Sequence, residues 1–294
     1  MATNGETKEP HNTIIGNSKS FWLWNSDSGF DLTHPSIPDA PAISPRVRIE
    51  TTTTAITIDP AKSALVIIDM QNFFLSPALG RAKGNGHKAL DQLVQNAIPA
   101  CRKAGIRVVW VNWGLTQDEV ENMPSALLKA FGFEKDSLRP GPGGLGSDMG
   151  TVTDPESTKE IQVGKMLMRD QWNTDVYPPL DKWYAEGQQL DTRPDVWIHK
   201  NRMSGAWGTK PALEEYLEKE GIRTLFFTGV NTDQCVGGTY QDCHSKGYDC
   251  VLLSDGCGTT SPTFAKEMIE FNAANSWGFV TSCKALADGV EAMK

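Results

Sequence analysis

The sequence has no apolar run that approaches the roughly 20 residues needed to cross a bilayer. It has no stripe of lysine and arginine interleaved with aromatic residues, and its formal net charge is −8. We therefore expect neither a membrane partner nor a nucleic-acid partner. The first residues also lack the charged-then-apolar design of a secretory signal, so a soluble, cytoplasmic protein is expected.

The ligand spacings of metal sites are missing as well. The five histidines form no H-x-H or H-x-x-x-H pair, and the six cysteines form no C-x-x-C pair. We expect no bound metal and no other cofactor. The loose cysteine spacing is typical of buried free thiols in a cytosolic chain, with room for one reactive thiol among them.

What the sequence does have is a regular alternation of short apolar runs and amphipathic stretches. The runs that predict strands are Ser63–Asp69, Arg107–Trp113, Asp195–His199, Thr224–Thr228, Cys250–Ser254 and Gly278–Ser282. The stretches that predict helices lie near 86–104, 209–220, 233–246 and 262–275. Apolar strands followed by helices indicate an α/β, Rossmann-like three-layer fold with a central, mostly parallel six-stranded sheet.

Two stretches fall outside this alternation. Residues 1–55 are polar and aperiodic, apart from the aromatic island 21–24, and predict an N-terminal arm that packs on the body or on a neighbouring subunit. Residues 115–194 contain a Gly/Pro cluster and an aromatic-rich part, and predict a lid-like insertion that covers or borders a site. We expect residues 56–294 to form one domain.

Three polar residues lie at or just after the ends of predicted strands, at the sheet edge where ligands collect in open parallel sheets. Asp69, Lys200 and Cys235 would supply a base, an electrostatic orienter and a nucleophile there. The start of a helix at Cys235 would favour its thiolate. Plainer interpretations stay open: a helix-capping aspartate, an ordinary exposed lysine, and a buried apolar thiol.

These residues stand in three longer runs. The runs are ALVIIDMQN at 64–72, KNRMSGAWGT at 200–209 and TGVNTDQCV at 228–236. In this order and spacing the chain resembles the isochorismatase-like cysteine hydrolases, which include nicotinamidases and ureidoacrylate amidohydrolases. The resemblance covers roughly residues 56–290.

The resemblance implies a catalytic triad of Asp69, Lys200 and Cys235. It also implies a cis peptide between Val230 and Asn231, and an oxyanion hole made by the backbone N–H groups of Asn231 and Cys235. The reaction expected is hydrolysis of a C–N bond in a small amide, ureide or carbamate through an acyl-enzyme. We also expect a homo-oligomer, either a dimer or a tetramer.

Departures from the family patterns bear on the substrate. The segment 110–116 offers no metal ligands, which disfavours a nicotinamidase, and the cysteine argues against isochorismatases proper, which lack it. The likeness is strongest to ureidoacrylate amidohydrolases, through the leader 56–60, Asn112, Phe271-Asn272 and Trp277-Gly278, although Met203 replaces a tyrosine of those enzymes.

Four residues near the motif strand ends are expected to face the substrate: Asn112, Glu119, Met203 and Trp207. A core position for Trp207 and a solvated helix face for Glu119 are open alternatives. The rival function is a binding or interaction protein that kept this fold and lost efficient turnover. A nicotinamidase-type or isochorismatase-type hydrolase of another substrate is the remaining alternative.

Overall fold

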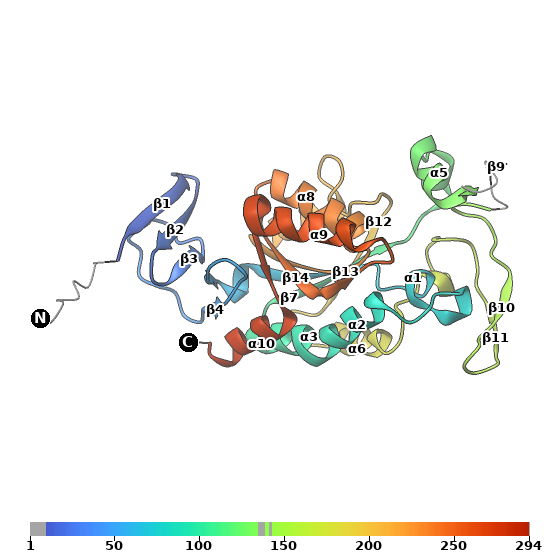
Figure 1. Ribbon diagram of the computed structural model, residues 1–294, viewed down its shortest axis with the longest axis horizontal. Helices are drawn as coiled ribbons and strands as arrows, with labels where there is room; N and C mark the ends of the chain where they lie inside the picture. The colour runs from blue at the N-terminus through green and yellow to red at the C-terminus, as the bar shows by residue number, and fades with distance from the viewer. Residues whose placement is uncertain (1–9, 135–138, 141–142, 294) are drawn as a thin grey trace, which may run out of the picture.

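A six-stranded parallel sheet forms the centre of the protein (Figure 1). The computed structural model describes residues 10–134, 139–140 and 143–293. In spatial order the strands are β12 (Val196–Lys200), β7 (Arg107–Trp113), β6 (Ser63–Ile68), β13 (Thr224–Val230), β14 (Asp249–Gly258) and β15 (Phe279–Thr281). Every neighbouring pair is parallel, which confirms the predicted α/β fold.

Helices cover both faces of this sheet, because nearly every strand residue is buried and needs apolar cover on each side (Figure 1). One face carries α2 (Asn85–Gln92), η3 (Leu93–Ala97), α3 (Ile98–Ala104), α6 (Leu180–Gln188) and α10 (Cys283–Glu291). The other carries α7 (Ala212–Lys219), η5 (Thr232–Val236), α8 (Gly237–Ser245), α9 (Thr263–Asn272) and η6 (Ala273–Trp277). Two apolar cores result, one on each face.

The sequence prediction missed helix α10 and the π-helical turns. A signal for α10 was present: Ser282 caps the helix by accepting the N–H of Ala285, and the apolar residues Cys283, Leu286 and Val290 follow at helical spacing. The π-helical segments η3, η5 and η6 interrupt stretches that read as continuous helices. An apolar period of 3.6 residues cannot reveal one inserted residue.

The N-terminal segment differs from the aperiodic arm that its sequence predicts. It forms a second sheet in the order β1 (Asn12–Asn17), β2 (Ser20–Asn25), β3 (Gly29–Leu32), β5 (Ile56–Ile58) and β4 (Val47–Ile49). Strand β1 is exposed along its whole length, so it carries no alternating apolar pattern. Residues 1–9 of the expected arm lie outside the described residues.

One buried carboxylate ties this second sheet to the body. Asp249, at the start of β14, accepts hydrogen bonds from Trp22 Nε1 at 2.8 Å and from Thr224 Oγ1 at 3.1 Å. His34 Nε2 lies 2.6 Å from the same carboxylate. The Trp22 ring also packs on Phe279 in the last strand of the main sheet. The N-terminal sheet therefore packs against the main domain through specific contacts.

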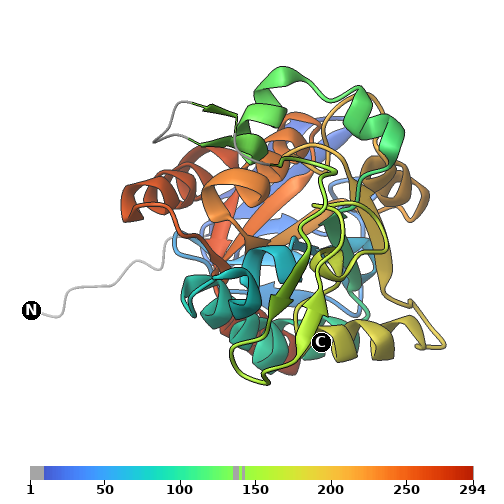
Figure 2. The same ribbon diagram turned by 90° about the vertical axis from the view of Figure 1, so that its right-hand side faces the viewer.

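The segment between β7 and β12 spreads over one end of the main sheet (Figure 2). It contains α4 (Gln117–Glu121), α5 (Ser125–Gly132), the strand pairs β8 (Phe133–Glu134) with β9 (Arg139–Pro140) and β10 (Thr151–Thr153) with β11 (Glu160–Gln162), then η4 (Trp172–Thr174) and α6. Residues 135–138 and 141–142, within the Gly/Pro-rich part, lie outside the described residues.

The insertion packs on residues of α1 (Asn72–Leu75) and β7 to form a third apolar cluster. Its buried members are Phe73, Trp113, Leu115, Met123, Leu145 and Leu167. The short elements η1 (Pro60–Lys62), α1 (Asn72–Leu75) and η2 (Pro77–Leu79) complete the fold. No helix within the described parts of the chain is long and apolar enough to cross a membrane.

Candidate active site

Asp69, Lys200 and Cys235 meet beyond the carboxyl ends of three strands. Asp69 directly follows β6 and has a φ of +53°, so the chain turns sharply as it leaves the strand. Lys200 is the last residue of β12, and its Nζ lies 3.0 Å from Asp69 Oδ2. The Cys235 thiol is close enough to the Asp69 carboxylate for the carboxylate charge to raise the pKa of the thiol. All three residues are at most 6% exposed.

The lysine is held from several sides. Its Nζ donates to the carbonyl oxygens of Arg202 at 3.1 Å and Met203 at 3.0 Å. The same ammonium lies 4.1 Å from the centroid of the Trp113 ring, close enough for a cation–π interaction. A buried ammonium with these partners keeps its position and orients the neighbouring carboxylate.

Burial controls the proton on the thiol. It raises the pKa of Cys235 to about 12, although the Lys200 charge pulls in the opposite direction. Burial also raises the pKa of Asp69 above its ordinary value, against the Lys200 charge and the hydrogen bonds that the carboxylate accepts. Burial therefore opposes the thiolate that the helix start was expected to favour. Burial thus favours the neutral thiol at Cys235, beside the buried carboxylate of Asp69.

The backbone around Cys235 is shaped by the chain on both sides. The Val230–Asn231 peptide is cis, as the resemblance implied. The Asn231 carbonyl accepts the N–H groups of Gln234 at 3.0 Å and Val236 at 3.2 Å, which flank Cys235. Thr239 Oγ1 donates to the Cys235 carbonyl at 2.7 Å.

Thr239 also links the cysteine helix to the loop that follows the lysine. Its hydroxyl accepts the N–H of Gly205 at 3.0 Å while it donates to Cys235. One residue earlier, a Cβ on Gly238 would lie 3.1 Å from the terminal methyl of Met203. A Cβ on Gly237 would lie 2.8 Å from Ile269. The two glycines therefore let the lysine loop and α9 pack directly against this helix.

Met203 and Trp207, two of the residues expected to face the substrate, lie on this loop and are accessible. Their side chains are 45% and 57% exposed. Trp207 is therefore not a core residue, and the guanidinium of Arg202 lies 5.0 Å from its ring centroid. Because the Lys200 ammonium donates to the carbonyl of Met203, this loop is tied directly to the site.

Asn112 differs from its expected place above Cys235. Trp113, the next residue of β7, directs its ring to Lys200, and successive strand side chains point to opposite faces. Asn112 therefore lies on the other face, with Trp110 and with its register partner His199. It is fully buried, and neither polar atom of its amide has a hydrogen-bond partner among the described residues.

Glu119 has structural partners instead of an open position. It forms a capping box with Thr116, and its Oε1 accepts the Asn201 amide at 2.6 Å. Burial opposes ionisation, but the bonds from Thr116 and Asn201 and the nearby Arg169 charge lower the pKa of Glu119 overall. This carboxylate thus ties α4 to the lysine loop.

Two residues that the sequence analysis did not single out complete the site. The Trp113 N–H donates to Asp69 Oδ1 at 3.2 Å and to Gln71 Oε1 at 3.1 Å. Gln71 Nε2 in turn donates to the carbonyls of Trp113 and Thr174, each at 2.8 Å. Their positions at a strand end and within the first motif were signals for such a role.

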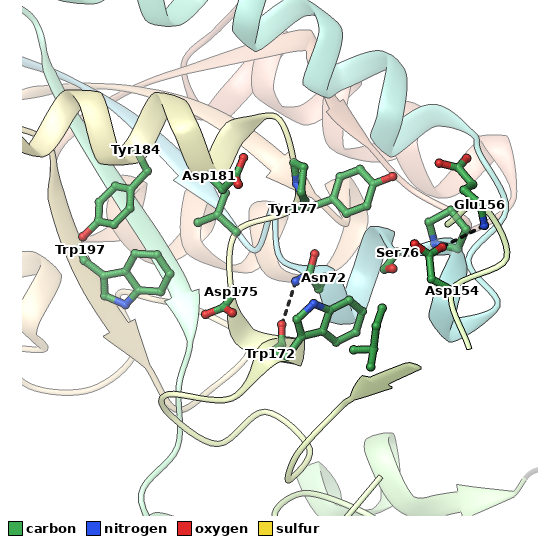
Figure 3. Close-up of a pocket in the computed structure, with 14 residues that line it drawn as sticks. Asn72, Ser76, Asp154, Glu156, Trp172, Asp175, Tyr177, Asp181, Tyr184 and Trp197 are labelled. Carbon is green, nitrogen blue, oxygen red and sulfur yellow. Dashed lines mark hydrogen bonds between the residues drawn. The ribbon is translucent and has the colours of Figure 1, made fainter. Parts of the chain in front are cut away.

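A cavity of about 550 Å³ opens elsewhere on the molecule (Figure 3). Asn72, Trp172, Asp175 and Tyr184 are among its lining residues, and none of the three triad residues is. Trp197 also lines it and, by strand alternation, lies on the opposite sheet face from Lys200. This cavity is therefore separate from the triad.

Within the described residues, no group of three or more His, Cys, Asp or Glu side chains could hold a metal ion.

A family model described as the isochorismatase domain matches residues 63–283, which include all three triad positions. The chain belongs to the isochorismatase family. It is accordingly a hydrolase of that family.

Solved structures share the fold of this isochorismatase-family chain. A cysteine hydrolase from Pseudomonas syringae pv. phaseolicola 1448A is 17% identical, with a TM-score of 0.58, over 85% of this chain and 99% of the other. Nicotinamidase PncA from Bacillus subtilis is 20% identical, with a TM-score of 0.54, over 75% and 99%. An isochorismatase family protein from Desulfovibrio vulgaris is 19% identical, with a TM-score of 0.52, over 77% and 97%.

Proposed function

We propose that this isochorismatase-family hydrolase uses Cys235 to cleave a C–N bond in a small amide, ureide or carbamate. The observation that carries the proposal is the buried set of a thiol, a hydrogen-bonded carboxylate and the ammonium paired with it. A thiol beside a base and an orienting charge is the arrangement that nucleophilic catalysis requires. Similar folds include a protein named as a cysteine hydrolase and one named as a nicotinamidase.

In the first half-reaction the Asp69 carboxylate takes the proton of the Cys235 thiol as its sulfur attacks the substrate carbonyl carbon. Burial raises the pKa of both groups, so the Asp69 carboxylate is a stronger base than an exposed one and can accept the proton of the thiol. The backbone N–H groups of Asn231 and Cys235 bind the oxyanion of the tetrahedral intermediate. Asp69 then gives its proton to the departing nitrogen, and a thioester remains on Cys235.

In the second half-reaction a water molecule attacks the thioester carbonyl. Asp69, again ionised, accepts one proton of that water, and the tetrahedral intermediate expels the Cys235 sulfur. The proton returns from Asp69 to the sulfur, which restores the neutral thiol, and the acid product leaves. Throughout, Lys200 keeps the carboxylate in place through the 3.0 Å ion pair and balances its charge.

For the substrate we propose the ureidoacrylate type, with Met203 and Trp207 on its pocket wall. Both residues are exposed on the loop whose carbonyls hold the Lys200 ammonium, so a ligand beside them would lie next to the triad. Asn112 and Glu119 take other roles: Asn112 is buried on the far sheet face, and Glu119 positions the lysine loop.

We further propose a cytoplasmic homo-oligomer, a dimer or a tetramer. All six cysteines are free thiols, which fits a reducing compartment.

The proposed assembly rests on an exposed apolar face. Helix α9 exposes Phe264, Met268 and Phe271, at 70%, 48% and 67%, on one face. A second copy related by a two-fold axis would present the same apolar stripe and cover it. Light scattering coupled to size exclusion measures the assembly, and a monomer at micromolar concentration contradicts it.

The test of the catalytic proposal is Cys235→Ala assayed on a panel of amides, ureides and carbamates. Turnover should fall by at least about 10³-fold, as expected when nucleophile and base act as a unit. Cys101→Ala removes the same sulfur from a buried site in α3 and serves as the matched control. Cys235→Ala activity near that of the control would refute the cysteine mechanism, and so would a wild-type protein that turns over none of the panel.

A further inference from the structure

The cavity of Figure 3 lies outside the proposed reaction and has a distinct chemistry. The loop between β10 and β11, the segment 172–178 and helix α6 form most of its wall, and Asn72 and Ser76 close it from the side of α1. Its volume of about 550 Å³ is enough for a small organic molecule. The proposed function leaves its composition unexplained.

All the charged residues that line this cavity are acidic. Asp154, Glu156, Asp175 and Asp181 line the cavity, and its described lining contains no lysine, arginine or histidine. Glu156 is neutralised by Lys83 at 2.8 Å. Asp175 and Asp181 form no ion pair within the described chain, and burial together with the Asp170 charge raises the pKa of Asp175. A cation bound here would relieve this repulsion.

Four aromatic residues face the same space: Trp172, Tyr177, Tyr184 and Trp197. The rings of Tyr184 and Trp197 pack together at 5.1 Å between centroids and make one wall (Figure 3). Aromatic faces attract cations through their quadrupole and also cover the alkyl part of an organic cation. A hydrated metal ion would make no use of such walls.

A buried amide adds an observation that is independent of the carboxylates. Asn72 is only 4% exposed, and its Nδ2 donates to the Trp172 carbonyl at 2.8 Å. This bond fixes which end of the amide is the oxygen, because a carbonyl accepts only from N–H. Oδ1 therefore points away from Trp172 into the cavity, where it accepts no bond from a described residue (Figure 3).

We propose that this cavity binds an aliphatic amine cation that has at least two ammonium groups. One ammonium would lie among Asp175, Asp181 and Asn72 Oδ1, which together supply charge and hydrogen-bond acceptors. The alkyl chain would run along the aromatic walls, and the second ammonium would reach Asp154 at the other end of the cavity (Figure 3). The need for N–H donors favours amines over quaternary ammonium ions.

The test is calorimetric titration of the full chain with 1,4-diaminobutane, butylamine and tetramethylammonium chloride at matched ionic strength. The diamine should bind at least about tenfold more tightly than butylamine, and tetramethylammonium most weakly. Asp175→Asn and Asp181→Asn should each weaken diamine binding by about tenfold. Asp191→Asn removes the same charge from an exposed loop after α6, outside the cavity lining, and should leave binding unchanged.

Asp175→Asn is expected to fold, since the Asp175 side chain has no hydrogen-bond partner within the described chain and its charge is costly there. A melting curve checks this for each variant. The proposal is overturned if the diamine does not bind, if butylamine binds equally well, or if Asp191→Asn weakens binding as much as the two cavity variants. The last result would show a general response to net charge.

Discussion

Replacing Asp69 with asparagine should make Cys235 more reactive toward iodoacetamide while it abolishes turnover. The Asp69 charge raises the pKa of the Cys235 thiol, so this pKa should fall when the charge is removed. Lys200→Met should have the opposite effect on the thiol, because the lysine charge lowers its pKa. Both variants should lose turnover, since one lacks the base and the other lacks its orienting partner.

The size of the effect follows from the contact between the groups. With a pKa of about 12, about one Cys235 thiol in 10⁴ is ionised at pH 8. A charge in direct contact shifts a pKa by about 1–3 units. Thiolate nucleophilicity falls as its pKa falls, with a Brønsted slope of about 0.45, so Asp69→Asn should alkylate about 3-fold to 40-fold faster. Lys200→Met should be slower by a similar factor.

The assay is intact-mass spectrometry of timed iodoacetamide reactions at pH 8, with peptide mapping of the labelled site. Burial raises the pKa of Cys101, Cys243 and Cys257 further than that of Cys235, so Cys235 should be labelled first. Cys235→Ala gives the background rate. The reasoning about the site would be refuted by slower alkylation in Asp69→Asn, or faster alkylation in Lys200→Met, in variants that keep the wild-type melting temperature.

Three further predictions follow from other parts of the molecule. Hydrolysis should survive prolonged chelation by EDTA, because the described residues offer no metal-ligand group; activity lost on chelation and restored by zinc would contradict this. Met203→Tyr should shift the order of kcat/KM values toward ureidoacrylate-like substrates without changing the alkylation of Cys235, and an identical order would remove Met203 from the pocket wall. Asn112→Leu should keep activity and raise the free energy of unfolding by about 1–3 kcal/mol, because it removes a buried amide without partners. Urea denaturation measures that change, and loss of activity in a folded Asn112→Leu protein would instead support substrate binding by Asn112.

The main sheet could be predicted from the sequence because its strands are buried on both faces. Each reads as a short apolar run, and a polar residue marks where the strand ends, as at Asp69 and Lys200. The N-terminal sheet could not be predicted in this way. Its strand β3 pairs with β5 more than 20 residues later, and its strand β1 has no buried face. Neither fact leaves a local pattern.

Within the site, the sequence indicated which residue types come together but not which way each one points. The single-residue step from Asn112 to Trp113 decides which side chain reaches the lysine, and the strand end could only be placed to within a residue from the sequence. Likewise, the protonation of Cys235 depends on burial by segments distant in sequence. A helix start was visible in the sequence, but the cover that outweighs it was not.

The order of the strands gives the three catalytic positions unequal mechanical support. Strands β6 and β13, which precede Asp69 and Cys235, each have a hydrogen-bonded neighbour on both sides, whereas β12, which ends in Lys200, is an edge strand with β7 as its neighbour. Edge strands open more readily than central ones in native-state amide exchange. Fraying of β12 would withdraw the ammonium and leave the thiol and carboxylate in place. Local unfolding of β12 would therefore stop catalysis while the position of Cys235 is still unchanged.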